Sequence, residues 1–176
     1  MDILCAALDY AKNFPVIPLQ KDKKPFLKWQ DYQRRKATAD EIKQWWSKYP
    51  NAMIGIVTGQ ISGLFVVDCD SEEGFDAVQK LLPDSLDIPT ARTPRGGWHL
   101  YFQYPTDSKL TVQAGIMPGV DIRGEGGYIV AAPSMNGNGK GYQWLDGLSL
   151  DQVAPPALPN ALLSAFNNNI NNSIYR

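Results

Sequence analysis

The chain has 176 residues, of which 44% are hydrophobic and 20% are charged, and its net charge is −1. This length provides for one sizeable core or two small ones, and the composition is ordinary for a globular domain. No apolar stretch reaches the roughly 18 residues of a membrane span, and the N-terminus lacks the basic start of a signal peptide. The two cysteines have no metal-binding spacing. We therefore expect an intracellular, cytoplasmic protein with no membrane partner.

The first half of the chain alternates between helices and strands. Hydrophobic periodicity and turn residues predict helices over 3–13, 38–49 and 71–82, and strands over 14–19, 53–58 and 64–68. Thr38 and Glu41 form a capping-box pattern at the start of the second helix, and Ser71 is placed to cap the third. The strands 53–58 and 64–68 are separated by a short turn-like segment, so we expect them to be adjacent.

The second half is rich in strands. The pattern predicts strands over 98–103, 119–123, 128–132 and 142–145, and a short helix over 158–166. Four residues with three glycines separate 119–123 from 128–132, which predicts a hairpin. We therefore expect a single compact α+β domain over residues 1–166, followed by residues 167–176 as an Asn-rich tail or a truncated linker.

An apolar run at residues 65–67 ends in two carboxylates, Asp68 and Asp70. Side chains two residues apart on a strand share a face, so these carboxylates point the same way. They repel each other unless a cation lies between them. The pattern therefore predicts a divalent metal ion held by oxygen ligands.

A third aspartate, Asp121, lies between Val120 and Ile122 in a later predicted strand. A buried carboxylate is costly unless it is paired or bound to a metal. Asp121 is therefore a candidate third ligand. The alternative is an ion pair of Asp121 with Arg123 or Arg95.

A turn with adjacent glycines, Gly96 and Gly97, precedes the predicted strand that carries His99. Glycines let backbone N–H groups approach an anion closely, and Arg95 and His99 add charge or hydrogen bonds for phosphate oxygens. The alternative is an ordinary hairpin turn beside a structural histidine.

A basic segment with interleaved aromatic residues precedes the capping box. Its cations are Lys21, Lys23, Lys24, Lys28, Arg34, Arg35 and Lys36, and its aromatic residues are Phe26, Trp29 and Tyr32. This composition suits phosphate backbones and bases, and one of the lysines is a candidate for contact with a triphosphate. A solvated lysine-rich loop is the alternative.

Taken in order, these motifs resemble the bifunctional primase/polymerase (prim-pol) domain of the archaeo-eukaryotic primase superfamily. The resemblance covers about residues 10–135 and is carried by Asp-x-Asp at 68–70, Gly-Gly-x-His at 96–99 and Gly-Val-Asp-Ile-Arg-Gly at 119–124. It implies a catalytic core in which a small α/β unit packs against an antiparallel or mixed sheet like that of an RNA-recognition motif.

The resemblance also implies the roles of individual residues. Two Mg²⁺ or Mn²⁺ ions would be held by Asp68, Asp70 and Asp121. The incoming nucleotide would be bound by His99, Arg95, Gly96, Gly97 and Lys24, with Arg123 and Ser134 as further contacts. Template DNA would lie along Lys28, Trp29, Arg34 and Arg35.

The implied activity is template-directed DNA polymerisation with NTPs or dNTPs on a primed single strand. De novo priming is a weaker expectation, because relatives often need a helical segment after the core. The family's habits also suggest a larger replication protein with a helicase or another C-terminal module. Two alternatives remain: a metal-dependent nuclease or phosphoesterase built on the same carboxylates, and a non-catalytic nucleic-acid-binding module.

Overall fold

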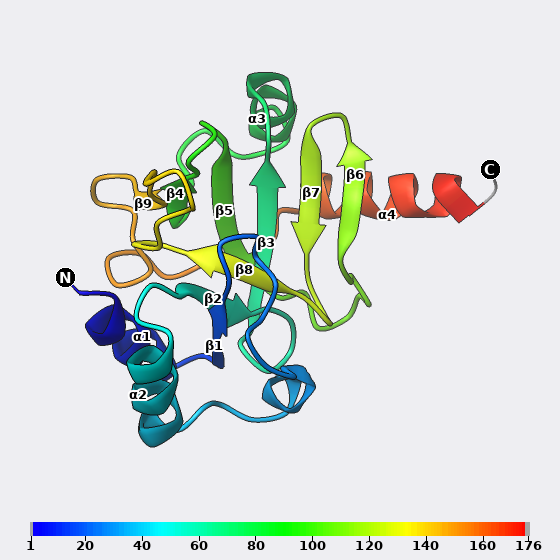
Figure 1. Cartoon of the computed structure of the whole chain (residues 1–176). Helices are drawn as coiled ribbons and strands as arrows, with labels where there is room; N and C mark the ends of the chain where they lie inside the picture. Colours follow the sequence, from blue (N-terminus) through cyan, green and yellow to red (C-terminus); the bar gives the residue numbers. More distant parts are fainter. Residues whose placement is uncertain (1, 175–176) are drawn as a thin grey trace.

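Two antiparallel sheets organise the chain, and their strands interleave along the sequence. The structure is a computed structural model and describes residues 2–174. A three-stranded sheet has the order β1-β2-β8, and a six-stranded sheet has the order β6-β7-β3-β5-β4-β9 (Figure 1). The strands are β1 (Val16–Leu19), β2 (Met53–Val57), β3 (Leu64–Cys69), β4 (Thr90–Arg92), β5 (Trp98–Gln103), β6 (Gln113–Met117), β7 (Val120–Arg123), β8 (Tyr128–Ala131) and β9 (Gln143–Trp144). The helices are α1 (Ile3–Ala11), α2 (Ala39–Lys48), α3 (Glu72–Gln79), α4 (Asn160–Ile174) and a 3₁₀ turn at Gln30–Gln33.

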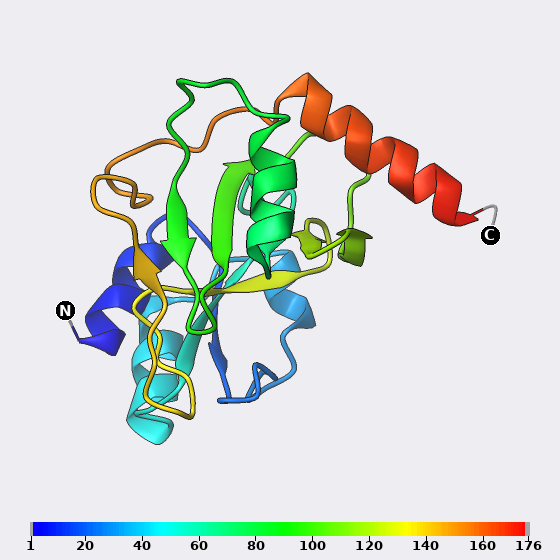
Figure 2. The same ribbon diagram turned by 90° about the horizontal axis from the view of Figure 1, so that it is seen from above.

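Strand alternation divides the apolar residues between two cores. Along β3, Leu64 and Val66 belong to the core shared with the small sheet, whereas Phe65 and Val67 belong to the other core. Helices α1 and α2 pack with the small sheet, and α3 and α4 pack on the opposite face of the large sheet (Figure 2). The large sheet therefore lies between two layers, the small sheet on one face and α3 and α4 on the other, and the α+β class is confirmed.

The predicted helix starts are confirmed in atomic detail. Thr38 Oγ1 accepts a hydrogen bond from the Glu41 N–H, and the Glu41 carboxylate accepts one from the Thr38 N–H, each at 3.1 Å. Ser71 Oγ accepts from the Gly74 N–H at 3.1 Å. Helix α3 ends at Gln79, earlier than predicted. These caps satisfy N–H groups that a helix start leaves without partners.

Two predicted strand pairings are wrong. The strands β2 and β3 are not neighbours, because β2 joins the small sheet and β3 the large one, with a single bridge between Gly59 and Leu64. The strands β7 and β8 form no hairpin for the same reason. Thr58 Oγ1 donates to the Gly124 carbonyl at 2.6 Å, where the chain crosses from one sheet to the other. A glycine-rich turn indicates a change of direction, but not which sheet the next strand joins.

Helix α4 is longer than the predicted short helix and continues through the Asn-rich segment to Ile174. Asparagine is a poor helix former, so packing must favour this helix. Leu162 and Phe166 are fully buried against the large sheet, and Ile170, one helical repeat further on, is partly buried in the same core. The predicted boundary at residue 166 falls inside this helix. Strands β4 and β6 were not predicted, because one has three residues and the other contains the exposed pair Ala114 and Gly115.

Candidate active site

The register of the large sheet places the acidic residues side by side. Asp68 lies opposite His99 on β5 and opposite Asp121 on β7. Asp70 follows the end of β3, and its N–H donates to the Gly119 carbonyl at 2.8 Å. One ligand oxygen from each of the three aspartates lies within 4.8 Å of the others. The predicted carboxylate cluster therefore exists, on the sheet face that meets the small sheet.

Two glycines allow the segments around this cluster to approach closely. Gly119 has φ +72°, and a Cβ there would collide with the Ser71 hydroxyl. A Cβ at Gly97 would collide with the Cys69 carbonyl, next to Asp70. A larger residue at Gly97 would push the turn away from the end of β3, and one at Gly119 would displace the Ser71 hydroxyl that caps α3.

The environment shifts the pKa values of Asp68 and Asp70 in opposite directions. Burial acts to raise the pKa of Asp68, but the hydrogen bond and charge of His99 outweigh burial, and the pKa is lowered. His99 Nε2 lies 3.4 Å from Asp68 Oδ1. Burial, together with the charges of Asp68 and Asp121, raises the pKa of Asp70 to about 6. The raised pKa of Asp70 thus reflects both burial and repulsion by the neighbouring carboxylates, and a bound cation would relieve this repulsion.

Asp121 makes two further contacts. Its Oδ1 accepts a hydrogen bond from the Gly115 N–H at 2.7 Å, and its Oδ2 lies 3.9 Å from Arg123 Nη2. The ion pair considered as an alternative is therefore present, but it is long. The all-oxygen donor set matches the preference of Mg²⁺ and Mn²⁺.

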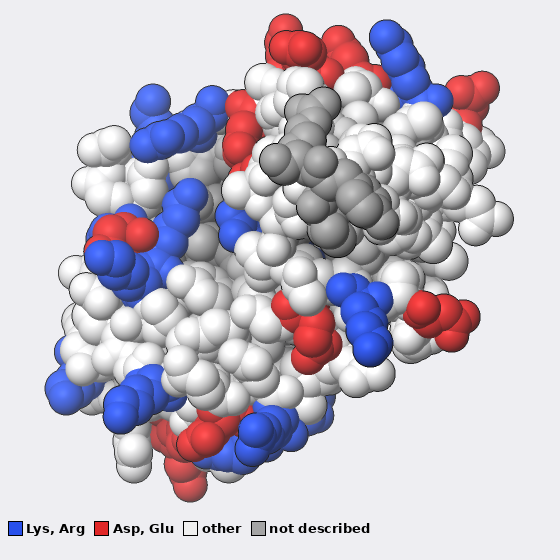
Figure 3. Space-filling view, turned by 90° about the vertical axis from the view of Figure 1, so that its right-hand side faces the viewer, with Lys and Arg blue, Asp and Glu red and all other residues white. Residues whose placement is uncertain are grey.

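The aspartates line a cleft of about 650 Å³ whose walls carry positive charge. Its basic side chains are Lys21, Lys23, Arg95, Arg123 and Lys140. Figure 3 shows Lys and Arg side chains gathered around a hollow in the surface, with acidic side chains at its edge. Such walls suit a polyanionic ligand that reaches down to the carboxylates.

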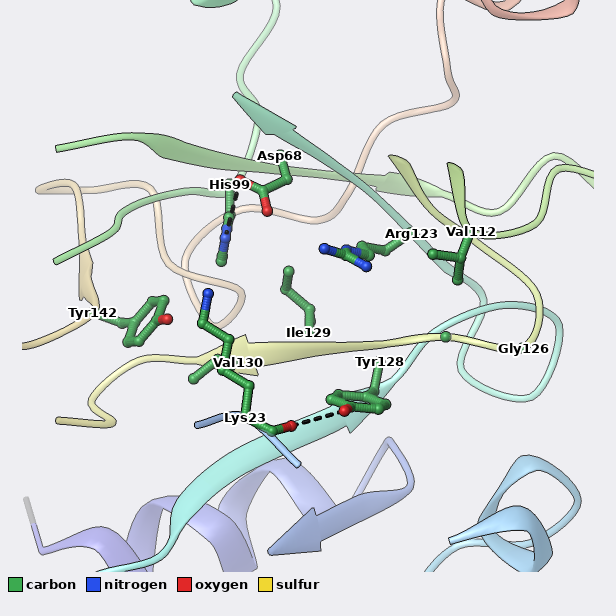
Figure 4. Close-up of a pocket in the computed structure, with 11 residues that line it drawn as sticks. Lys23, Asp68, His99, Val112, Arg123, Gly126, Tyr128, Ile129, Val130 and Tyr142 are labelled. Atoms are coloured by element: carbon green, nitrogen blue, oxygen red, sulfur yellow. Dashed lines mark hydrogen bonds and ion pairs between the residues drawn. The ribbon is translucent and has the colours of Figure 1, made fainter. Parts of the chain in front are cut away.

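Two loops from outside the large sheet bring lysines to the cleft. The Lys21 ammonium donates to the Met135 carbonyl at 2.6 Å, which ties the loop after β1 to the loop after β8. The Tyr128 hydroxyl donates to the Lys23 carbonyl at 2.7 Å. Lys23 has φ +74°, and its side chain extends into the space between His99 and Tyr142 (Figure 4). The cleft is therefore assembled from both sheets.

Comparison with known protein families identifies the family of this chain. The sequence model of the family described as "Bifunctional DNA primase/polymerase, N-terminal" matches residues 7–161. The chain belongs to this family. Membership implies a metal-dependent enzyme of the nucleotidyltransferase type, with nucleotide and nucleic-acid substrates. No curated protein matches the chain significantly. Within residues 2–174, no helix has the length and apolar character needed to cross a membrane.

Most of the residues that were predicted to bind metal or nucleotide line the cleft of this prim-pol domain. They are Asp68, Asp70, Arg95, His99, Asp121 and Arg123. Lys24 is not among the lining residues; its neighbour Lys23 is. The Lys24 carbonyl accepts from the Gln20 N–H at 2.8 Å in a tight turn, and Lys24 is exposed.

The remaining nucleotide candidates have partners within the protein. The N–H groups of Gly96 and Gly97 donate to the carbonyl and hydroxyl oxygens of Thr93, at 3.0 and 2.9 Å. The buried Ser134 hydroxyl accepts from the Ile54 N–H at 2.8 Å, which joins the end of β8 to β2. The structure thus gives all three residues a role in holding the site together.

The residues predicted to contact template DNA differ in their surroundings. Arg35 pairs with Glu41 at 2.7 Å at the start of α2. Trp29 packs edge-on against Tyr128, with ring centroids 5.1 Å apart. Lys28 and Arg34 are exposed.

Sequence reasoning missed several cleft residues, chiefly Tyr142, Lys140 and Asn136. They belong to a segment rich in glycine and asparagine, which folds back so that Met135 bridges Gly141. The composition signals a turn, but its position across from the carboxylates depends on contacts distant in sequence. A second cavity of about 340 Å³ adjoins the cleft along β8 and shares its Lys23, Asp68, His99, Arg123 and Tyr142 walls (Figure 4).

Proposed function

We propose that the chain is a template-directed nucleotidyl transferase that extends a DNA primer with NTPs or dNTPs inside the cell. The observation that carries the proposal is the cluster of Asp68, Asp70 and Asp121 in a cleft with basic walls. Acidic ligands for a metal beside basic contacts for phosphates are the combination that stabilises a phosphate reacting at a metal ion. Membership of the prim-pol family supports the same reaction class.

Two Mg²⁺ or Mn²⁺ ions held by these aspartates would stabilise charge on the reacting phosphate and lower the pKa of the attacking 3′-hydroxyl. The chain itself contributes by holding the three aspartates in place. Strand pairing fixes Asp68 and Asp121 opposite each other, and the Gly119 carbonyl anchors Asp70 beside them. The ligands are therefore preorganised before a nucleotide arrives.

The basic side chains of the cleft bind the triphosphate in this proposal. Arg95 comes from the turn before β5, and Lys23 comes from the opposite layer. His99 has its Nε2 directed at Asp68, while its buried Nδ1 has no partner among residues 2–174. A bound nucleotide would supply a partner for such a buried polar atom.

In this proposal the template strand runs past Trp29 and Tyr128, where Tyr128 lines the smaller cavity and Lys28 is exposed. Aromatic faces stack bases without regard to sequence, and nearby lysines neutralise phosphates. Initiation without a primer is proposed as a secondary activity.

A primer-extension assay tests the proposal. The chain is incubated with a labelled primer on a single-stranded template, all nucleotides, and Mg²⁺ or Mn²⁺. Stepwise lengthening that depends on the metal is the expected result. Shortening of the primer would identify a nuclease, and a retarded but unchanged strand would identify a binding module. The same template without primer reports priming.

A further inference from the structure

Tyr142 lies where the cleft and the smaller cavity meet. It lines both spaces, and the whole residue is only 4% exposed. Its ring lies 5.7 Å from the ring of His99, centroid to centroid. Its N–H donates to the Ser134 carbonyl at 2.9 Å, which fixes the backbone at this point. The aromatic ring is therefore held in place beside the site rather than free to swing.

The hydroxyl of this tyrosine is unused within the protein. It points into the cavity, toward the Lys23 side chain (Figure 4). It makes no hydrogen bond to any of residues 2–174. By contrast, the hydroxyl of Tyr128 on the same cavity is bound to the Lys23 carbonyl at 2.7 Å. A phenolic hydroxyl both donates and accepts, so this group is available to a ligand.

The arrangement of charge indicates which part of a nucleotide reaches this hydroxyl. The α-phosphate must lie at the aspartates, and the remaining phosphates lie along the basic walls of the cleft. The smaller cavity also has neutral walls, at Val112, Ile129 and Val130. The α-phosphate is bonded to the β-phosphate on one side and to the pentose on the other. Because the smaller cavity combines these neutral walls with the shared Lys23 and Arg123, whereas the cleft has further basic walls at Lys21, Arg95 and Lys140, the uncharged pentose suits the smaller cavity better than the β- and γ-phosphates do.

We propose that Tyr142 recognises the pentose of the incoming nucleotide, with its hydroxyl hydrogen-bonded to a sugar hydroxyl. The inference rests on the proposed nucleotidyl transfer and adds the residue that distinguishes one sugar from another. Tyr142 is a specificity residue, because it contacts the part of the substrate that does not react.

The test compares the wild type with Tyr142→Phe, which removes only the hydroxyl. Single additions to a primer are measured with a ribonucleotide, a deoxynucleotide and a dideoxynucleotide of the same base. If the contact is to the 2′-hydroxyl, kcat/KM for the ribonucleotide falls about five- to tenfold relative to the other two. If it is to the 3′-hydroxyl, the ribonucleotide and deoxynucleotide both fall relative to the dideoxynucleotide.

Calorimetry measures the affinities of the same three nucleotides without primer or template. The losses of affinity caused by Tyr142→Phe must follow the same order as the losses of kcat/KM. Equal losses of kcat/KM and affinity for all three sugars, or no change in these quantities for any of them, would overturn the inference. Tyr104→Phe is the matched control, because it removes a hydroxyl that already has partners, the carbonyls of Ser108 and Leu110, at a residue that lines neither space, and its ratios between sugars stay at the wild-type values. If the wild type extends no primer, the proposed function fails; if it extends but the ratios do not respond to Tyr142→Phe, only the sugar inference fails.

Discussion

Asp68 and Asp121 face each other across the antiparallel pair formed by β3 and β7. Directly opposed like charges destabilise a sheet, yet these two residues share the face that is enclosed by the small sheet. His99, opposite Asp68 on the other side, and Arg123, near Asp121, offset only part of this charge. The sheet thus gathers negative charge that a bound cation would neutralise.

Replacing His99 with glutamine should weaken nucleotide binding more than template binding. The imidazole lies beside Asp68, and its buried Nδ1 has no partner among residues 2–174, so it is placed to act at the carboxylate end of the cleft. We expect KM for the nucleotide to rise about tenfold, as for one charge-assisted hydrogen bond. Steady-state primer extension gives KM, and fluorescence anisotropy gives the template Kd. A larger change in template Kd than in KM would refute this assignment.

Lys23 and Lys24 offer a comparison between adjacent lysines. Lys23 lines the cleft and Lys24 does not, so Lys23→Gln should raise the nucleotide KM about five- to tenfold while Lys24→Gln leaves it near the wild-type value. Both substitutions remove one positive charge, which controls for general attraction of nucleotides. Equal effects of the two variants on KM, measured at several salt concentrations, would show that only net charge matters.

Much of this site could be predicted locally. The spacing of Asp68 and Asp70 fixes their common face, because strand alternation is a property of the backbone. The same rule gives the face of Asp121, but not its partner strand, which depends on long-range pairing. Within the basic segment, Lys24 rather than Lys23 was expected to contact the nucleotide, since the positive φ of Lys23 is set by the turn and by Tyr128. Tyr142 comes from a loop that no local pattern places at the site.

Gly119→Ala should destabilise the protein more than Gly63→Ala. Both glycines have positive φ, +72° and +68°, so both variants lose about 1 kcal/mol to backbone strain. Only at Gly119 does the new methyl group collide with Ser71, which adds about 1–3 kcal/mol. Urea unfolding of the two variants measures the difference. Equal losses in the free energy of unfolding would mean that the close approach of Gly119 to α3 is not needed.

Stability should depend on pH through Glu41. Hydrogen bonds from Arg35, and further ones from Tyr32 and the Thr38 N–H, lower the pKa of Glu41 from 4.5 to about 2. Because the folded state holds this carboxyl ionised, its contribution is present above pH 4.5 and is lost as the pH falls toward 2. The difference in unfolding free energy between the wild type and Glu41→Gln should shrink over that interval. A difference that stays constant with pH would contradict this account.

Primer extension by Asp121→Asn tests the central claim most directly. The amide keeps the size of the side chain but removes the charge that completes the three-carboxylate cluster, whereas Asp107→Asn makes the same change at an exposed residue that lines neither the cleft nor the adjoining cavity. With Mg²⁺ or Mn²⁺ present, we predict that Asp121→Asn slows extension by about 100-fold or more, and that Asp107→Asn extends at the wild-type rate. Extension by Asp121→Asn at the wild-type rate would show that the cluster is not the site of nucleotidyl transfer.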